Sequence, residues 1–226
     1  MKVKFVVATR VSAEDFFEKT ATGRSLRLQK SPNMEIWLTP DNRAGLPQVY
    51  NAAIQRAAAE PAVLIFAHDD LHILDLSLAD QVCNALQRFD IIGLAGNKRR
   101  FARQPAWAFI DEKFTWDEPE NLSGAVGHGP GFPPTSVEYY GPSPQEVKLL
   151  DGVFLAAHSA KLINAGIAFD ERFDFHFYDM DFCRQAEVKN LKCGTWPISV
   201  VHESGGGFGS PAWVLGYAHY LAKWGT

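Results

Sequence analysis

The chain has 226 residues, of which 46% are hydrophobic and 21% are charged, and its formal net charge is −4 at pH 7. This composition is typical of a globular protein, and the length suits one domain or at most two. The slight acidic excess argues against a general nucleic-acid-binding protein, because such proteins usually carry a basic surface.

The cysteines and the apolar runs predict where the protein resides. Cys83, Cys183 and Cys193 form no C-x-x-C pair, and their odd number favours a reducing compartment. The apolar run at the start is too short for a signal peptide, and no stretch approaches the ~20 apolar residues of a membrane-spanning helix. We therefore expect a single cytoplasmic domain over residues 1–226 without a transmembrane segment. The sequence leaves homo-oligomerisation open.

Strands alternate with helices over the first hundred residues. Ser12 is a candidate N-cap for a helix that begins near residue 13. Apolar runs predict strands and amphipathic runs predict helices, in the order strand 3–8, strand 34–40, helix 46–60, strand 62–67, helix 77–89 and strand 91–96. This alternation predicts a parallel α/β sheet, in which ligands bind at the carboxyl ends of the strands.

The pattern breaks from residue 97 to 145, where glycine, proline, aromatic and basic residues gather. Because this segment is long for a plain loop, we expect an irregular insertion near the active site that is functional or carries short strands. Apolar strands then resume at 147–157, with Asp151-Gly152 in the middle, and at 194–202, ending at His202. Ser210 followed by Pro211 is a strong start for a final helix.

The strand at 62–67 runs directly into His68-Asp69-Asp70. Adjacent carboxylates repel one another, so the pair needs a cation, strong hydrogen bonds or water. Mg²⁺ and Mn²⁺ are commonly held by one or two carboxylates together with substrate phosphates. The simpler interpretation is a solvated turn. His202 either completes a metal site as a neutral imidazole or is a partly buried residue at a strand end.

Two further acids, Asp179 and Asp181, lie in the run "FYDMDF". A carboxyl group beside aromatic side chains has a raised pKa, which suits a general base. Acids in a first helical turn also complement the helix dipole. We expect Asp179 to be functional and Asp181 to be structural, within reach of Arg184 three residues on.

The order of these motifs resembles the GT-A glycosyltransferases, specifically the family 2-like group and its streptomycin-biosynthesis-type subgroup. The resemblance is carried by "GLPQVYNAAI" and "VLIFAHDD", and by "LLDGVFLAA", "FDERFDFHFYDMDFCRQA" and "WPISVVHESGGGFG". It implies a GT-A fold, with a central, mostly parallel sheet flanked by helices. It also implies inverting transfer of a hexosyl group from a nucleoside-diphosphate sugar to an acceptor hydroxyl.

The resemblance also implies roles for individual residues. His68-Asp69-Asp70 resembles the DXD-type motif of the family, with Asp70 binding Mn²⁺ or Mg²⁺ and Asp69 near the ribose or the metal. Asp179 matches the base, and His202 matches a histidine of the metal or diphosphate site. The remaining matches are Asp151 and Gly152 in the sugar and acceptor pocket, and Thr9, Arg10 and Asn42 around the nucleotide.

The sequence departs from the family pattern at two places. Tyr178 stands where the family usually has a glutamate before the base. The segment between the first strand and "DNRAGL" is short, so a usual nucleotide-binding strand and its aspartate are missing or merged into 34–42.

Two other functions stay open at this point. One is a metal-dependent hydrolase built on His68, Asp70, His72 and His202, because residues two apart on an extended segment share a face. Such an enzyme would bind metal tightly without a nucleotide. The other is a non-catalytic sugar-binding or partner-binding module, which would bind its ligand without turnover.

Overall fold

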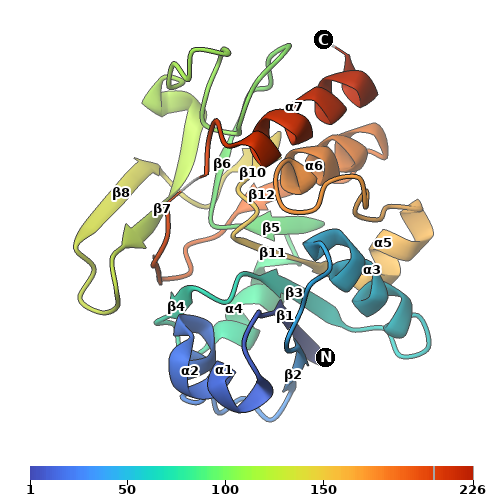
Figure 1. Cartoon of the computed structure of the whole chain (residues 1–226). Coiled ribbons are helices and arrows are strands. Elements are labelled where there is room, and N and C mark those ends of the chain that lie inside the picture. The colour runs from blue at the N-terminus through green and yellow to red at the C-terminus, as the bar shows by residue number, and fades with distance from the viewer. Residues whose placement is uncertain (206, 226) are drawn as a thin grey trace.

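The computed structural model describes residues 1–205 and 207–225, and over this part of the chain the strands form two mixed sheets (Figure 1). The strands of the first sheet are, in spatial order, β2 (Met34–Thr39), β1 (Val3–Ala8), β3 (Val63–Ala67), β11 (Phe154–His158), β5 (Ile91–Gly93), β12 (Cys193–Thr195) and β9 (Glu146–Val147). Those of the second are β10 (Leu149–Leu150), β6 (Ala95–Asn97), β7 (Leu122–His128), β13 (Val200–His202) and β4 (Leu71–Ile73), with β8 (Ser136–Gly141) paired to β7.

Helices flank these sheets. They are α1 (Ala13–Lys19), α2 (Ala21–Leu26), α3 (Leu46–Arg56), α4 (Leu78–Ala85), the short 3₁₀ helix η1 (Pro119–Asn121), α5 (Ser159–Ala165), α6 (Tyr178–Val188) and α7 (Pro211–Trp224). The predicted caps are present, since the hydroxyls of Ser12 and Ser210 accept hydrogen bonds from the backbone N–H groups of Asp15 and Trp213. The α/β class predicted from the sequence is confirmed. None of the helices that the structure describes is long and apolar enough to cross a membrane.

The first sheet is built around two fully buried strands, β1 and β3. These strands are apolar at nearly every position because both faces of the sheet are covered. The pairs β1–β2, β1–β3 and β5–β12 are parallel, as the alternation of strands and helices predicts. By contrast, β11 runs antiparallel to both β3 and β5, so that its first residue, Phe154, lies beside Ala67 at the end of β3.

The chain crosses between the two sheets in short steps. Residues 68–70 lead from β3 to β4, residue 94 from β5 to β6, residues 151–153 from β10 to β11, and residues 196–199 from β12 to β13. The predicted strands 91–96, 147–157 and 194–202 are therefore each wrong as single strands. An apolar run stays apolar where the chain changes sheet, so hydrophobicity alone does not mark the break.

Two predicted helices are shorter in the structure. The helix predicted at 46–60 ends at Arg56, and the one predicted at 77–89 ends at Ala85. In the second case Leu86 and Phe89 remain buried beyond the helix. Because residues in the turn after the helix are also buried, the apolar pattern continues beyond the helix end. The pattern therefore overestimates the length of the helix.

The segment 97–145 carries strands as well as loops. It holds η1 and the β7–β8 hairpin, which projects from the body of the molecule in Figure 1. A loop at residues 98–118 precedes the hairpin and buries Trp107 and Phe109. The hairpin and the loop both lie in the half of the molecule that contains the second sheet.

A buried carboxylate connects α6 to α7. Asp181 is fully buried, accepts hydrogen bonds from Trp224 Nε1 and Gln185 Nε2 and forms an ion pair with Lys223 Nζ, each at 2.7 Å. The predicted pairing with Arg184 is not what holds it, because the Arg184 guanidinium lies over the Trp224 ring at 4.6 Å. Spacing along α6 alone predicts that Arg184 pairs with Asp181, but Arg184 packs on the Trp224 ring of α7 instead.

Candidate active site

A cavity of about 370 Å³ opens between the two sheets. Its floor comes from His68 of the β3–β4 crossing, from the crossing at residues 151–153 and from the first turn of α6. Its walls are aromatic, and come from the segment 97–145 and from the chain that leads into α7. The lining residues used below are His68, Trp107, Phe109, Trp116, His128, Glu138, Tyr140, Asp151, Gly152, Tyr178, Asp179 and His202.

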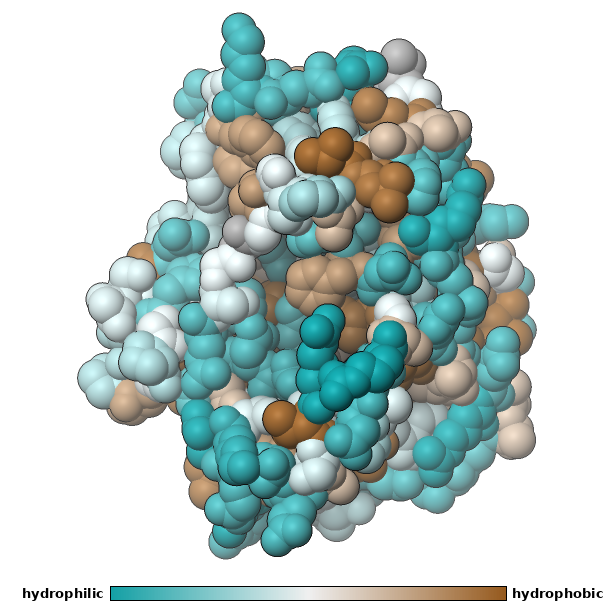
Figure 2. All heavy atoms as spheres, viewed as in Figure 1, coloured by the Kyte–Doolittle hydropathy of each residue, from teal (hydrophilic) through white to brown (hydrophobic). Residues whose placement is uncertain are grey.

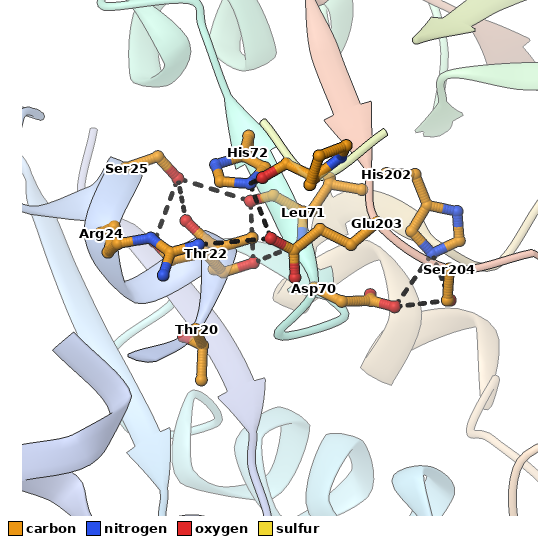
Figure 3. Close-up of polar contacts among 12 residues, drawn as sticks. Thr20, Thr22, Arg24, Ser25, Asp70, Leu71, His72, His202, Glu203 and Ser204 are labelled. Carbon is orange, nitrogen blue, oxygen red and sulfur yellow. Dashed lines mark hydrogen bonds and ion pairs between the residues drawn. The ribbon is translucent and has the colours of Figure 1, made fainter. Parts of the chain in front are cut away.

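Three side chains form a group that could hold a metal ion, and two of them, His68 and His202, line the cavity. His68 and Asp70 belong to the β3–β4 crossing, and His202 ends β13, so the group joins both sheets. One ligand atom of each lies within 4.8 Å of those of the other two. His202 Nε2 is 3.3 Å from Asp70 Oδ2, which also accepts a hydrogen bond of 2.6 Å from the Ser204 hydroxyl (Figure 3).

The donor set fits a divalent cation. Asp70 Oδ1 is buried and has no hydrogen-bond partner among the described residues, so one carboxylate oxygen is left for a cation. Carboxylates suit Mg²⁺ and Mn²⁺, and imidazoles suit ions such as Zn²⁺ and Fe²⁺, so this mixed set fits a divalent metal ion. Burial lowers the pKa of His68, which favours the neutral imidazole that a metal requires.

Asp70 and His202 shift each other's pKa. Burial alone would raise the pKa of Asp70, but the hydrogen bonds from His202 and Ser204 lower it below its ordinary value. Burial alone would lower the pKa of His202, but the hydrogen bond and charge of Asp70 raise it. Asp70 is therefore ionised at neutral pH, as a metal-binding carboxylate must be.

Tyr178, at the start of α6, determines which nitrogen of His68 carries the proton. Its hydroxyl donates a hydrogen bond of 2.6 Å to the carbonyl of Gly152 and lies 2.9 Å from His68 Nε2. Since the single hydroxyl proton is used by Gly152, His68 Nε2–H is the donor in the second contact. The lone pair is then on Nδ1, the nitrogen that lies 4.0 Å from Asp70 Oδ1.

The second acid of the triplet, Asp69, points elsewhere. Its Oδ2 accepts a hydrogen bond of 2.6 Å from the hydroxyl of Thr9, at the end of β1. The carbonyl of Thr9 in turn accepts one of 2.8 Å from the backbone N–H of Asn42. The structure thus brings Thr9, Asn42 and Asp69 together, while Arg10 extends exposed from the next position. None of these four is among the described residues that line the cavity.

Thr22 of α2 holds the crossing in place, a contact that sequence reasoning missed. It is fully buried, and its hydroxyl lies 2.7 Å from the carbonyl oxygen of His68 and 3.0 Å from both the carbonyl oxygen and the backbone nitrogen of Leu71. Its own backbone N–H donates to the carbonyl of Asp69 at 3.1 Å. Figure 3 shows Thr22 and Leu71 beside the Asp70 carboxylate.

Asp179 lies in the first turn of α6 and faces the cavity. Burial and the nearby charge of Asp151 raise its pKa to about 7. Hydrogen bonds to Asp179 from the backbone N–H groups of Gly152, at 3.0 Å, and Met180, at 2.8 Å, oppose this rise. The carboxyl group therefore changes protonation near neutral pH, as a general base does.

Asp151 and Gly152 form the turn between β10 and β11, not the middle of a strand. Asp151 accepts hydrogen bonds from Trp107 Nε1, at 2.7 Å, and from the backbone N–H of Val153, at 2.8 Å. A Cβ on Gly152 would lie 2.6 Å from the Tyr178 hydroxyl and 2.8 Å from Asp179 Cβ. Only glycine allows the turn to approach the base this closely.

Two further observations concern histidines. His72 is directed away from the metal-capable group, because its Nε2 lies 2.8 Å from Glu203 Oε1, which also pairs with Arg24 (Figure 3). His128, at the end of β7, lines the cavity, and its Nε2 is buried without a hydrogen-bond partner among the described residues. The segment 97–145 has no regular periodicity that would have singled out His128 from the sequence.

Comparison with known proteins identifies structures that share the fold of this chain. No protein-family model and no curated protein sequence matches the chain. Solved structures do match: GalNAc-T7 with UDP, GalNAc and Mn²⁺ (TM-score 0.60, 11% identity, 99% of this chain and 48% of that one); the mannosyltransferase PcManGT from Pyrobaculum calidifontis with GDP-Man and Mn²⁺ (0.55, 12%, 100% and 65%); and S. aureus TarS (0.53, 15%, 90% and 37%).

The chain spans less than two thirds of the length of each of these proteins, and about half of GalNAc-T7. At these identities the likeness concerns the arrangement of strands and helices. That arrangement is the fold of the GT-A glycosyltransferases.

Proposed function

We propose that the chain is a metal-dependent, inverting glycosyltransferase that moves a hexosyl group from a nucleoside-diphosphate sugar to an acceptor hydroxyl. The observation that carries this proposal is the juxtaposition of Asp179, whose pKa is about 7, with His68 and His202 in the lining of one cavity. The UDP, GalNAc and Mn²⁺ bound to GalNAc-T7 and the GDP-Man and Mn²⁺ bound to PcManGT support the donor class.

Asp179 is the proposed base. Its carboxylate takes the proton of the acceptor hydroxyl while the acceptor oxygen bonds to the anomeric carbon and the bond to the diphosphate oxygen breaks. This single displacement inverts the anomeric carbon. The products are the glycosylated acceptor, protonated Asp179 and the nucleoside diphosphate.

His68, Asp70 and His202 would hold the cation, with Tyr178 keeping Nδ1 of His68 free for it. When bound, a divalent cation neutralises charge that develops on the departing diphosphate. Thr9, Asn42 and Asp69 would contact the nucleoside part of the donor from the adjacent strand ends. The exposed Arg10 would reach its phosphates, and Asp151 and Gly152 would line the sugar and acceptor pocket.

Calorimetric titration with UDP, GDP and dTDP, with and without Mn²⁺, tests the proposal. We expect one of the three to bind only when Mn²⁺ is present. Asp70→Asn should abolish this binding, because it removes the only carboxylate of the metal-capable group. Asp179→Asn is the matched control, and should bind the nucleotide normally while no longer transferring sugar.

The same titration separates the two alternatives. Tight binding of Mn²⁺ or Zn²⁺ without any response to nucleotide would favour a metal-dependent hydrolase that uses His68, Asp70 and His202. The hydrolase alternative also uses His72 as a ligand, and the pairing of His72 with Glu203 weighs against that role. Nucleotide binding without turnover, unchanged in Asp179→Asn, would favour a non-catalytic sugar-binding module.

A further inference from the structure

The aromatic wall of the cavity begins at Trp116, whose surface is 51% exposed. The Trp116 indole is held in place by aromatic rings on two sides. Its ring is stacked on Tyr140, with centroids 6.0 Å apart and planes at 16°, and it meets Phe109 edge-on at 5.1 Å. The contacts fix the indole at the mouth of the cavity with half of its surface free.

The wall continues inward to the catalytic floor. Trp107 packs perpendicular to Tyr140 at 4.9 Å, and its Nε1 donates to Asp151. Asp151 precedes Gly152, whose backbone N–H donates to Asp179. A ligand resting on Trp116 would therefore enter from solvent along a surface that ends at the proposed base.

Polar groups accompany the rings along this wall. The Tyr140 hydroxyl donates to Glu138 Oε2 at 2.6 Å, and His128 Nε2 lies 3.5 Å from the same oxygen. His128 Nε2 is also the buried nitrogen without a hydrogen-bond partner among the described residues. A purely aliphatic ligand would leave His128 Nε2 without a partner and would remove water from the Glu138 carboxylate, both of which cost free energy.

We propose that this wall is the acceptor subsite and that the acceptor is a saccharide. The inference rests on the proposed function. A pyranose ring presents one face of C–H groups, which packs on a flat aromatic ring, and a rim of hydroxyls, which needs carboxylate and imidazole partners. Trp116 supplies the flat face, and Glu138, His128 and Asp151 supply the rim. Pockets that combine apolar walls with a few placed polar groups bind small ligands in this way.

Saturation-transfer NMR with a panel of methyl glycosides tests the proposal on the full chain with Mn²⁺ and the nucleoside diphosphate that it binds. We expect at least one glycoside to bind, with the strongest transfer to its ring C–H protons. Trp116→Ala should weaken this binding about fivefold or more. The control is Tyr139→Ala, which removes a neighbouring ring that is 70% exposed and does not line the cavity, and should bind as the wild type does.

Donor binding separates this inference from the function on which it rests. Nucleotide binding in the presence of Mn²⁺ should be unchanged in Trp116→Ala. If the nucleotide binds and no glycoside does, or a glycoside binds equally well to Trp116→Ala, the acceptor assignment is wrong while the transferase stands. Figure 2 shows apolar side chains gathered over the first turns of α7, so n-octanol is included as a probe. Binding of n-octanol alone, lost in Trp116→Ala, would replace the saccharide with an aliphatic acceptor.

Discussion

Asp179 is balanced between two opposing influences. Burial and the charge of Asp151 favour its protonated form, while two backbone N–H groups favour its ionised form. The outcome is a pKa of about 7, so a small change in pH changes the fraction of molecules that carry the base. Two measurable consequences arise at this residue.

The first consequence is the pH dependence of the reaction. Below pH 7 the rate of nucleoside diphosphate release should rise about tenfold per pH unit, and above pH 7 it should level off, because only the ionised carboxylate accepts a proton. Asp179→Asn should lower kcat by about 10²- to 10⁴-fold and remove this rise. A flat profile from pH 5 to 9, or wild-type turnover in the variant, would contradict the assignment.

The second consequence concerns stability. The pKa of Asp179 rises from 3.8 to about 7 on folding, so between these values the native state holds more protons than the unfolded state. The free energy of unfolding therefore falls as the pH rises from 4 to 7, by about 2–4 kcal/mol from this group. Urea unfolding at pH 4.5 and pH 8 should show a smaller difference in Asp179→Asn than in the wild type. Equal differences in the two proteins would mean that the carboxyl group titrates normally.

At the scale of elements, α2 matters through a single buried hydroxyl. Thr22 contacts the carbonyls of His68 and Leu71 and so fixes the crossing that presents Asp70. Thr22→Val keeps the shape and removes these bonds, and should weaken Mn²⁺-dependent nucleotide binding about tenfold, as loss of groups that orient metal ligands commonly does. Calorimetry measures this. Thr22→Ser restores the hydroxyl and should restore binding; failure to do so would show that the methyl group, not the hydroxyl, matters.

Helix α7 depends in a similar way on a buried acid of α6. Asp181 is fully buried, forms an ion pair with Lys223 and accepts a hydrogen bond from Trp224. Asp181→Ala leaves the Lys223 ammonium, which is 22% exposed, without this partner, and should lower the free energy of unfolding by about 3 kcal/mol. Urea denaturation tests this, with Glu171→Ala as a control on an exposed acid. A loss below about 0.5 kcal/mol would mean that Asp170, which also pairs with Lys223, is sufficient.

For the molecule as a whole, the sequence best predicts features that depend on residues close together in the chain, such as short strands and helix caps. The strands predicted at 3–8 and 62–67 and the caps at Ser12 and Ser210 depend on neighbouring residues. They are found where the pattern indicates, with the second strand beginning one residue later, at Val63. The points at which strands change sheet depend on partners far away in the chain, and all three split strands were missed there. Pairing between distant segments leaves no periodic trace in one sequence.

The same distinction holds for the candidate site. His68, Asp70, His202 and Asp179 were singled out through motifs and a family resemblance, and the structure places them around one cavity or beside it. His72 was included in the hydrolase alternative because of its spacing, but a pairing with Glu203 turns it away. Thr22 and the aromatic wall had no motif to mark them, since their importance lies entirely in what they touch.

The metal-capable group takes two members from the β3–β4 crossing and one from β13, which pairs with β4 so that His202 lies opposite Leu71, and the group therefore exists only when these two distant segments of the chain are paired. A cation held there binds the native state and not the unfolded chain. At a free cation concentration of about 100 times its Kd, it raises the free energy of unfolding by about 2.7 kcal/mol. The rise in melting temperature on adding Mn²⁺ thus reports on the contact between the β3–β4 crossing and the end of β13. A variant that keeps its circular dichroism spectrum but loses this rise has intact helices and strands and a disturbed contact between these two segments.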